Sequence, residues 1–327
     1  MKARTAAPKP AAKAPSYKVL DKGDATKDIA YDIPRYDGVM IITVQNGNPN
    51  GDPDNEGAPR QNPYTRRGEI SPASIKRKAR DGMLLRRRNE QGYDIFVQRD
   101  AALEDAKKSV IDQAEAAADN KEDAPRLAHE MMLDRFADVR MFGAVLAANK
   151  NTKIDNVRAA ISIFWGESVE PIDILDPTGT RMSSEKDRAA DNKENKGMYQ
   201  SHIVPFAVYL VPFHINPFEA RKNRLRPEDV EYFKTYGLPE IYENGNSTMR
   251  GDVGVHAIYA FKHDNVYGVP GVGRSELVRN AVQIRRVTQG TAASLADYEI
   301  GVATQDQLPK GVTLEVWKEP YSLKLFG

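Results

Sequence analysis

The sequence contains no cysteine, so disulfide bonds and cysteine-ligated zinc or iron–sulfur sites are excluded. Its longest mostly apolar run, residues 203–215, is too short to cross a bilayer and is interrupted by proline. No apolar segment typical of a signal peptide follows Met1. We therefore expect a cytoplasmic protein that has no membrane partner.

The sequence also lacks an excess of charge of either sign. Lys and Arg together number 47 and Asp and Glu 46, which gives a formal net charge of +1. This balance excludes a protein that is polycationic overall, so any surface that binds nucleic acid must be local. Hydrophobic residues make up 40% of the 327 residues, enough for a large core.

The first 18 residues consist mainly of Ala, Pro and Lys and have almost no apolar bulk. They predict a disordered basic extension over residues 1–35, for which a solubilising role is favoured over nucleic-acid binding. A single domain is expected over residues 36–327. Apolar runs predict strands at 38–45, 159–165, 202–213, 255–261 and 312–317. Because helices lie between them, we expect an α+β fold with long insertions.

A helix is predicted to begin after Ser71, a good N-cap residue, with Pro72 at its first position. Ile75, Ala79 and Met83 recur at helical spacing and should form its buried stripe. Two more helices are expected, over 101–118 and 126–148, and they make up a helical insertion at about 101–148. The polar, charge-balanced stretch 176–197 predicts an excursion from the body of the domain, either a loop or a solvated hairpin.

One near-match to a nucleotide-binding motif is present. Residues 268–275, GVPGVGRS, resemble the phosphate-loop pattern G-x-x-x-x-G-K-[ST], but Arg274 replaces the required lysine. A planar guanidinium does not substitute for the compact lysine ammonium at the phosphates. A Pro/Gly turn between a strand and a helix is therefore favoured over a nucleotide site.

The histidines and paired carboxylates give weak signals for metal. The five histidines include no H-E-x-x-H motif and no pair four residues apart. Asp52 and Asp54 share a loop, but the bidentate glutamate that closes a calcium loop is missing. Turn formation by these aspartates is favoured over metal binding. We expect no metal and no cofactor.

The strongest functional signal is a polar loop followed by a basic helix. Residues 46–60, NGNPNGDPDNEGAPR, follow an apolar strand and are too rich in Asn, Gly and Pro for a helix or a core. From Arg60 to Asp100 there are 11 Lys/Arg and 5 Asp/Glu, an excess of six positive charges. Glycine permits close approach to a sugar-phosphate chain, and asparagine donates without sequence preference. Either a phosphate-binding surface or a solvated helix face fits these residues.

These motifs carry a resemblance to a known family. Residues 46–60, followed by SIKRKARD at 74–81, are similar to the signature of the repeat-associated mysterious protein superfamily of CRISPR-associated proteins. More narrowly, the chain resembles the backbone subunit of the type I-C Cascade complex, with the type I-B subunit as a near relative. Further similar segments lie at 138–147, 201–211, 245–264 and 308–315. The helical stretch near 101–130 and residues 156–172 match poorly.

The resemblance implies a fold and a function. It implies an RRM-like (ferredoxin-like) palm with helical and hairpin insertions in the shape of a right hand, and a thumb-like excursion at about 166–200. Such a subunit is not an enzyme; it polymerises along CRISPR RNA and holds the guide for pairing with target DNA. Its implied partners are CRISPR RNA, target DNA, further copies of itself, the subunit that binds the 5′ handle, the large subunit and a recruited helicase-nuclease.

Pattern and resemblance together give the expected RNA-binding residues, which are Asn46, Asn48, Asn50, Arg60, Ser74, Lys76, Arg77, Lys78, Arg80, Arg140, Phe142, His202 and Arg250. The competing hypothesis is a metal-dependent RNase, as in type III relatives, that would use Asp52 and Asp54.

Overall fold

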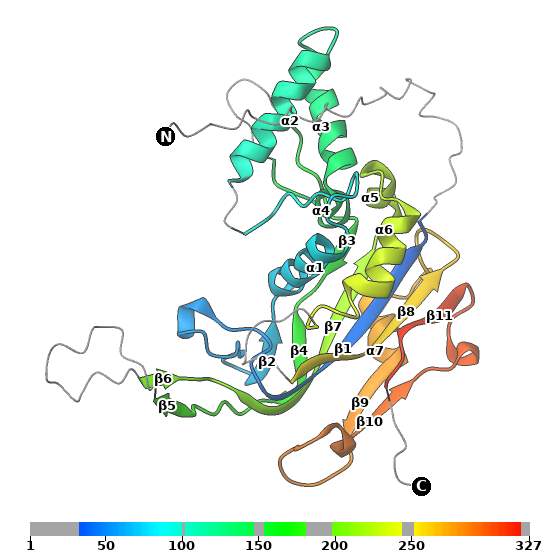
Figure 1. Ribbon diagram of the computed structural model, residues 1–327. Helices are drawn as coiled ribbons and strands as arrows, with labels where there is room; N and C mark the ends of the chain where they lie inside the picture. The colour runs from blue at the N-terminus through cyan, green and yellow to red at the C-terminus, as the bar shows by residue number, and fades with distance from the viewer. Residues whose placement is uncertain (1–32, 100–101, 147–153, 181–197, 244–251, 322–327) are drawn as a thin grey trace, which may run out of the picture. The chain divides into compact units, whose positions relative to one another are not determined.

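A computed structural model of the chain describes residues 33–99, 102–146, 154–180, 198–243 and 252–321. The described residues belong to one compact unit. Its centre is a seven-stranded sheet with the strand order β11–β8–β1–β7–β4–β2, in which β3 also pairs with β7. Every pairing in this sheet is antiparallel. Helices and an antiparallel sheet are therefore mixed, as the sequence predicted (Figure 1).

The strands and helices have the following bounds. The main sheet contains β1 (Arg35–Gly47), β2 (Arg67–Ile70), β3 (Ile161–Ile163), β4 (Gly166–Pro171), β7 (Val204–Ile215), β8 (Val253–His263) and β11 (Val312–Lys318). Two separate pairs are β5 (Thr178–Thr180) with β6 (Met198–Gln200) and β9 (Val282–Arg286) with β10 (Tyr298–Val302). The helices are α1 (Pro72–Arg86), α2 (Leu103–Ala117), α3 (Ala124–Arg135), α4 (Ala137–Phe142), α5 (Pro217–Lys222), α6 (Pro227–Tyr232) and α7 (Arg274–Ala281).

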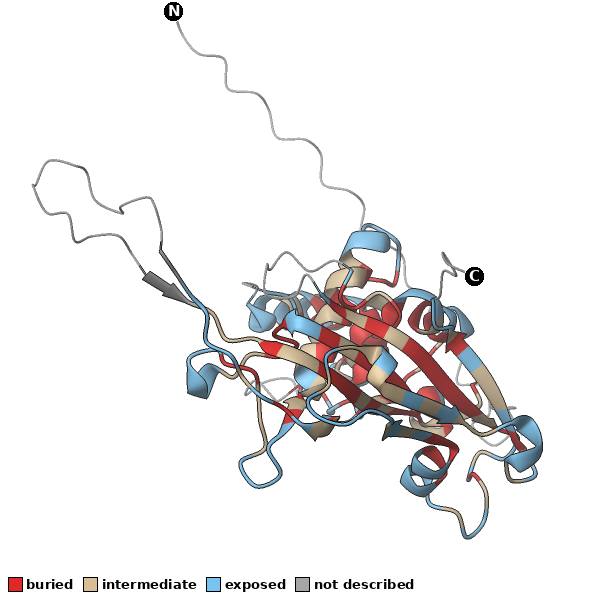
Figure 2. Cartoon of the chain, turned by 90° about the horizontal axis from the view of Figure 1, so that it is seen from below, coloured by how far each residue is buried: buried red, intermediate tan, exposed pale blue. Residues whose placement is uncertain are grey.

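Strand β1 lies in the interior of the sheet and is buried on both faces. Its side chains alternate, so Met40 and Ile42 join one hydrophobic cluster while Val39 and Ile41 join another. None of these four side chains is more than 2% exposed. Figure 2 shows the same burial along the neighbouring strands. The sheet is therefore the middle layer of the domain, with a covering of secondary structure on each side.

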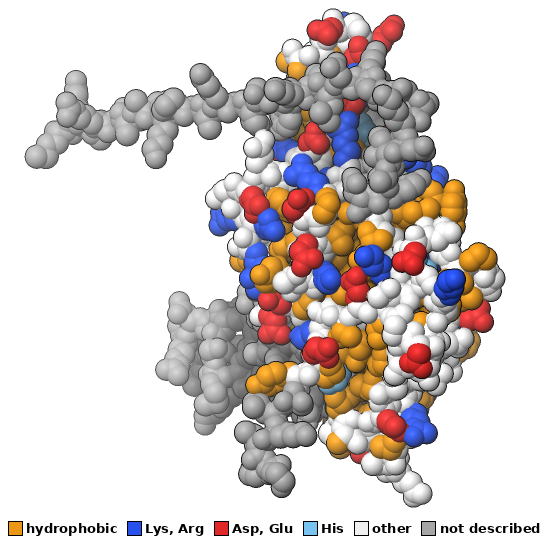
Figure 3. Space-filling model, turned by 90° about the vertical axis from the view of Figure 1, so that its right-hand side faces the viewer, with side chains coloured by type: hydrophobic (Ala, Val, Ile, Leu, Met, Phe, Trp, Pro, Cys, Tyr) orange, Lys and Arg blue, Asp and Glu red, His pale blue; other side chains and the backbone are white. Residues whose placement is uncertain are grey.

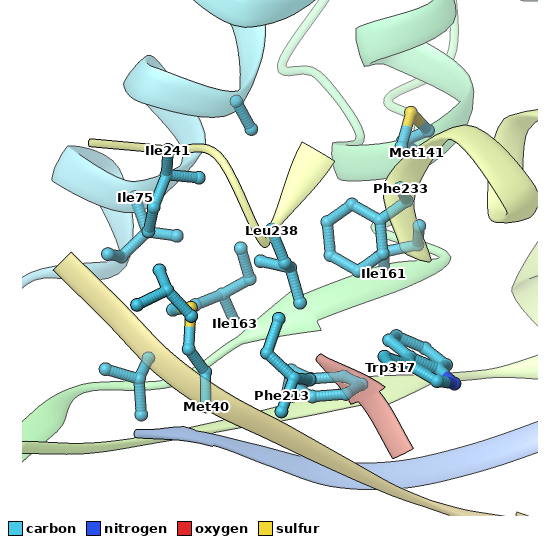
Figure 4. Close-up of a cluster of buried hydrophobic side chains, with 14 of the residues drawn as sticks. Met40, Ile75, Met141, Ile161, Ile163, Phe213, Phe233, Leu238, Ile241 and Trp317 are labelled. Carbon is cyan, nitrogen blue, oxygen red and sulfur yellow. The ribbon is translucent and has the colours of Figure 1, made fainter. Parts of the chain in front are cut away.

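The first face of the sheet carries α1 and the segment that follows α6. Ile75 of α1 and Phe233 and Leu238 after α6 point onto Met40 and Phe213 of the sheet (Figure 4). The second face is covered by α7 and the β9–β10 pair, whose Leu277, Val278 and Val282 pack on Val39 and Ile41. The two faces of the sheet are thus covered by different elements, which form separate surfaces of the domain.

Several sequence expectations are confirmed. Strand 38–45 forms, although it extends from Arg35 to Gly47. Helix α1 begins at Pro72, and the hydroxyl of Ser71 accepts the N–H of Ser74 at 3.2 Å. The buried stripe of Ile75, Ala79 and Met83 is also present, with each side chain at most 3% exposed.

One expected helix is interrupted. The segment predicted as helical over 126–148 ends as α3 at Arg135, because Phe136 takes an extended conformation (φ −105°, ψ 107°). Phe136 is buried against Phe96, with ring centroids 5.5 Å apart, and Ala137 donates its N–H to the backbone carbonyl of Asp94. Helix α4 then ends at Gly143, whose φ is +71°. Tertiary contacts override the helical pattern here.

Two expected boundaries differ. Ile33 is 5% exposed and belongs to the core, so the folded unit starts before residue 36; residues 1–32 lie outside the described part. Gly166–Pro171, expected in the excursion, is β4 of the main sheet. Beyond it, β5 and β6 pair and project from the sheet (Figure 1), and residues 181–197 lie outside the described part.

Gly38 generates a prediction about stability. A Cβ at this position would lie 2.3 Å from Cζ of Phe213 and 2.8 Å from the carbonyl oxygen of Tyr259. Gly38→Ala should therefore lower the free energy of unfolding by about 1–3 kcal/mol, the usual cost of overpacking. Gly254→Ala, in the adjacent strand β8, is the matched control because its Cβ would meet nothing within 4 Å. Urea unfolding of both variants measures the difference, and equal midpoints would contradict the steric account.

Arg140 generates a second prediction. Its guanidinium is 0% exposed and makes two 2.9 Å hydrogen bonds to the carboxylate of Asp229. Arg140→Gln would leave that buried charge without its partner and should cost about 3–5 kcal/mol. Arg126→Gln, which removes an exposed pair with Glu130, should cost at most about 1 kcal/mol. Urea unfolding of the two variants tests this, and an unchanged midpoint for Arg140→Gln would refute a structural role for the pair.

Candidate nucleic-acid interface

The polar loop after β1 is a closed, hydrogen-bonded structure. Asp52 donates its N–H to the carbonyl of Ala58 at 2.7 Å, and its own carbonyl accepts the N–H of Gly57 at 2.8 Å. The Asp52 carboxylate caps the short helical turn Pro53–Asn55 and pairs with Arg60 at 3.0 Å. Asp52 is therefore a turn residue, as the sequence favoured.

The asparagines of this loop have different roles. Asn48 and Asn50 are 8% and 6% exposed. Asn48 donates to the carbonyl of Gly57, and Asn50 accepts the backbone N–H and the hydroxyl of Ser71 at 2.8 and 2.9 Å. Asn50 thereby ties the loop to the N-terminus of α1. Asn46, which has a φ of +47°, is exposed and is the best placed of the three to contact a ligand.

Lys76 is the most distinctive cation on α1. Its ammonium lies 5.7 Å from the centroid of the Phe142 ring, and the Arg80 guanidinium lies 5.3 Å from the same centroid. Arg80 is paired with the buried Asp138 at 2.7 Å, whereas Lys76 has no ion pair within the described ranges. Burial, followed by the nearby charge of Arg80, lowers the pKa of Lys76. A partly desolvated cation of this kind gains from an incoming anion.

The neighbouring basic residues already have partners within the protein. Arg77 bonds to Asp81 and donates to the carbonyl of Val97 at 3.0 Å. Lys78 donates to the Ser74 hydroxyl at 2.6 Å, and its ammonium lies 4.9 Å from the centroid of the Tyr242 ring. The basic helix is therefore not a row of equivalent, solvated charges. On the face that Figure 3 draws, which is the right-hand side of Figure 1, cationic and acidic side chains are likewise interspersed.

The remaining expected site residues fall into three groups. Arg140 has no exposed surface and Phe142 is 5% exposed, so both are structural in this fold and we remove them from the RNA-binding candidates. His202 is partly exposed and pairs with Asp176 at 2.6 Å, at the base of the β5–β6 pair. Arg250 lies outside the described residues.

The sequence reasoning missed an exposed aromatic residue beside this loop. Tyr64 is 92% exposed at the tip of a turn. The side chain of Asn62 accepts the backbone N–H of Tyr64 and of Thr65, at 3.0 and 3.2 Å. Gln61 donates to the carbonyls of Arg66 and Ile172 from the other side. The signal in the sequence was NPYTRR, an aromatic residue between turn-forming residues and two arginines.

The structure also bears on the near-match to a phosphate loop and on the possible metal sites. Residues 268–275 lead through turns into α7, as the turn interpretation predicted. Arg274 does not lie in a closed loop; its guanidinium is stacked 4.9 Å from the Phe164 ring centroid. In the part of the chain that the structure describes, no group of three or more His, Asp or Glu residues could hold a metal ion. No helix there is long and apolar enough to cross a membrane.

Distant likenesses exist among solved structures. A chain of "CRISPR RNA-guided surveillance complex, pre-nicking" is 12% identical, with a TM-score of 0.45, and the match covers 73% of this chain and 83% of that chain. A chain of "Cryo-EM structure of the Type III-B Cmr-beta bound to cognate target RNA" is 10% identical, with a TM-score of 0.36, over 70% and 62% of the two chains. With TM-scores below 0.5, these likenesses carry no structural inference.

Sequence comparison is more specific. "CRISPR-associated protein Cas7" of Haloferax volcanii is 29% identical over 117 residues, which is 35% of this chain and 33% of that protein. The aligned region thus spans about a third of that relative. The model of the family "CRISPR-associated protein Cas7" matches residues 34–303. Because this match covers most of the folded unit, the chain belongs to the Cas7 family.

Proposed function

We propose that the chain is a non-catalytic subunit that polymerises along CRISPR RNA and forms the backbone of a type I Cascade effector, of subtype I-C. Its partners would be CRISPR RNA, further copies of itself, the other Cascade subunits and, through the guide, target DNA. The observation that carries the proposal is Lys76, a partly desolvated cation on the helix beside the Asn/Gly loop that has no carboxylate partner among the residues the structure describes.

The sheet supports the fold expected for such a subunit. Four adjacent antiparallel strands have the order β8–β1–β7–β4. In chain order, α1 lies between β1 and β4, and α5 and α6 lie between β7 and β8. This is the β-α-β-β-α-β order of a ferredoxin-like domain. We therefore propose that the sheet is the RRM-like palm and that the β5–β6 pair is the base of the thumb.

The residues of the proposed RNA site have two roles. Asn46, Ser74, Lys76 and Lys78 would contact the sugar-phosphate chain, since their side chains are exposed or partly exposed. Asn50 and Arg80 would hold the loop and helix in place through Ser71 and Asp138. Contacts to phosphate carry no base information, which suits a subunit that must hold guides of any sequence.

The alternative, an RNase that uses Asp52 and Asp54 with a metal ion, has less support. The Asp52 carboxylate already caps a turn and pairs with Arg60. Incubating the protein, assembled on its guide, with complementary RNA and Mg²⁺ separates the hypotheses. Periodic cleavage that EDTA abolishes would establish the RNase and overturn the non-catalytic assignment.

The first prediction about binding concerns salt. Each phosphate contact contributes about 0.7 to the slope of log affinity against log salt for a single strand. Lys76→Gln should therefore flatten the slope for RNA by about 0.7, equally for guides of unrelated sequence. Arg88→Gln, an exposed change just after α1, is the matched control and should leave the slope unchanged. Titration of labelled RNA from low to moderate salt measures the slope. An unaltered slope for Lys76→Gln would show that Lys76 makes no phosphate contact.

A second prediction concerns pH. Phosphate binding favours the protonated Lys76, so RNA affinity should fall as the pH rises through the lowered pKa of this residue. The fall should therefore occur in a pH range below the ordinary lysine pKa of about 10.4. Lys76→Arg keeps its charge over this range and should give a flatter profile. Affinity measured with 2′-O-methyl RNA, which resists alkaline cleavage, tests the difference, and identical profiles would contradict it.

A further inference from the structure

A groove of about 940 Å³ lies on the second face of the sheet, opposite the face that α1 covers. Its floor includes Val39 and Leu210 of the sheet, and one wall is formed by α7 and β9. Its rim carries two aromatic residues and several arginines. None of the proposed guide-binding residues lines this groove, so it is a separate surface.

The aromatic residues of the groove are presented for contact. Trp165 is 50% exposed, which is unusual for so large an apolar side chain. It follows Phe164 in the short connection between β3 and β4. The Arg274 guanidinium lies 4.9 Å from the Phe164 ring centroid, and both residues line the groove together with Trp165. Flat aromatic and guanidinium surfaces of this kind stack on nucleobases.

The arginines of the groove are of two kinds. Arg285 is paired with Glu299 at 2.7 Å, and Arg67 lies 4.0 Å from Glu167. Arg274 and Arg279 both extend from α7, are exposed, and have no ion pair within the described ranges. Two guanidinium groups without an ion pair in the described part of the chain share this groove with Phe164 and the exposed Trp165, and this combination matches a chain that carries both phosphates and bases.

We propose that this groove binds a second single-stranded nucleic acid, in addition to the strand proposed at α1, without sequence preference. Trp165 would stack on a base, while Arg274 and Arg279 would contact phosphates. Because the sheet separates the groove from α1, both strands can be bound at once. A second copy of the chain is the competing occupant; the unpaired positive charge favours a polyanion over it.

The test uses the protein assembled on its guide RNA, titrated with an oligothymidylate of about 20 nucleotides that does not match the guide, longer than a usual footprint. Fluorescence reports on the groove because the chain contains two tryptophans, and Trp317 is only 8% exposed. We expect saturable quenching of Trp165 fluorescence. Trp165→Phe should abolish the signal. Binding of a fluorescently labelled oligothymidylate, measured by anisotropy, should be roughly 5- to 150-fold weaker for Trp165→Ala if one base stacks.

Charge variants complete the test. The Arg274→Gln/Arg279→Gln double variant should flatten the salt slope for the oligothymidylate by about 1.4. Lys108→Gln/Lys121→Gln, which changes two exposed lysines of the helical insertion, is the matched control and should have no effect. Lys76→Gln should weaken guide binding but leave the oligothymidylate quenching intact, so failure at one site is distinguishable from failure at the other.

Three results would overturn the proposal. The first is the absence of quenching by the oligothymidylate. The second is unchanged affinity and slope in the Arg274→Gln/Arg279→Gln variant. The third is a change in Trp165 fluorescence that depends on protein concentration without the oligothymidylate and is lost in the same variant, which would assign the groove to contact between copies.

Discussion

Burial of β1 on both faces is the constraint on which the rest of the structure depends. The alternating side chains of this strand form part of two hydrophobic clusters, one toward α1 and one toward α7. The requirement for close packing extends to Gly38, where no Cβ fits. Because β1 is packed on both faces, the loop that follows Gly47 starts from a defined position. The hydrogen bonds from Ser71 to Asn50 then fix the N-terminus of α1 relative to this loop. Placement of the proposed guide-binding residues thus begins in the hydrophobic core.

Ion pairing within the protein decides which basic residues remain for a ligand. Arg80 and Arg140 are held by the buried carboxylates of Asp138 and Asp229. Each carboxylate also accepts backbone N–H groups, as Asp138 does from Phe96 at 2.7 Å. Removing such a cation would damage folding before it affected binding. Lys76 differs because the fold leaves it partly desolvated with a second cation nearby, which is costly without an anion.

Much of the fold could be predicted from the sequence where local signals agree with tertiary packing. The apolar run of β1, the Ser71–Pro72 start of α1 and its stripe from Ile75 to Met83 are of this kind. The break at Phe136 could not be predicted, because it depends on a partner ring forty residues earlier in the chain. The basic segment was identified from its charge, but the pairing of Arg80 depends on Asp138, which is distant in sequence. For the same reason the groove beside Trp165 was missed: its residues come from six separate segments.

The turn that carries Tyr64 has a consequence for the kinetics of association. Its backbone is held from both sides by Asn62 and Gln61, so the conformational entropy of this loop is lost when the protein folds and not when a partner arrives. A partner that meets the exposed ring would therefore require no loop rearrangement before docking. Contacts made by such a pre-ordered side chain act mainly on the lifetime of a complex, since association is limited by orientation and diffusion. Tyr64 is thus suited to prolong a contact that other residues initiate.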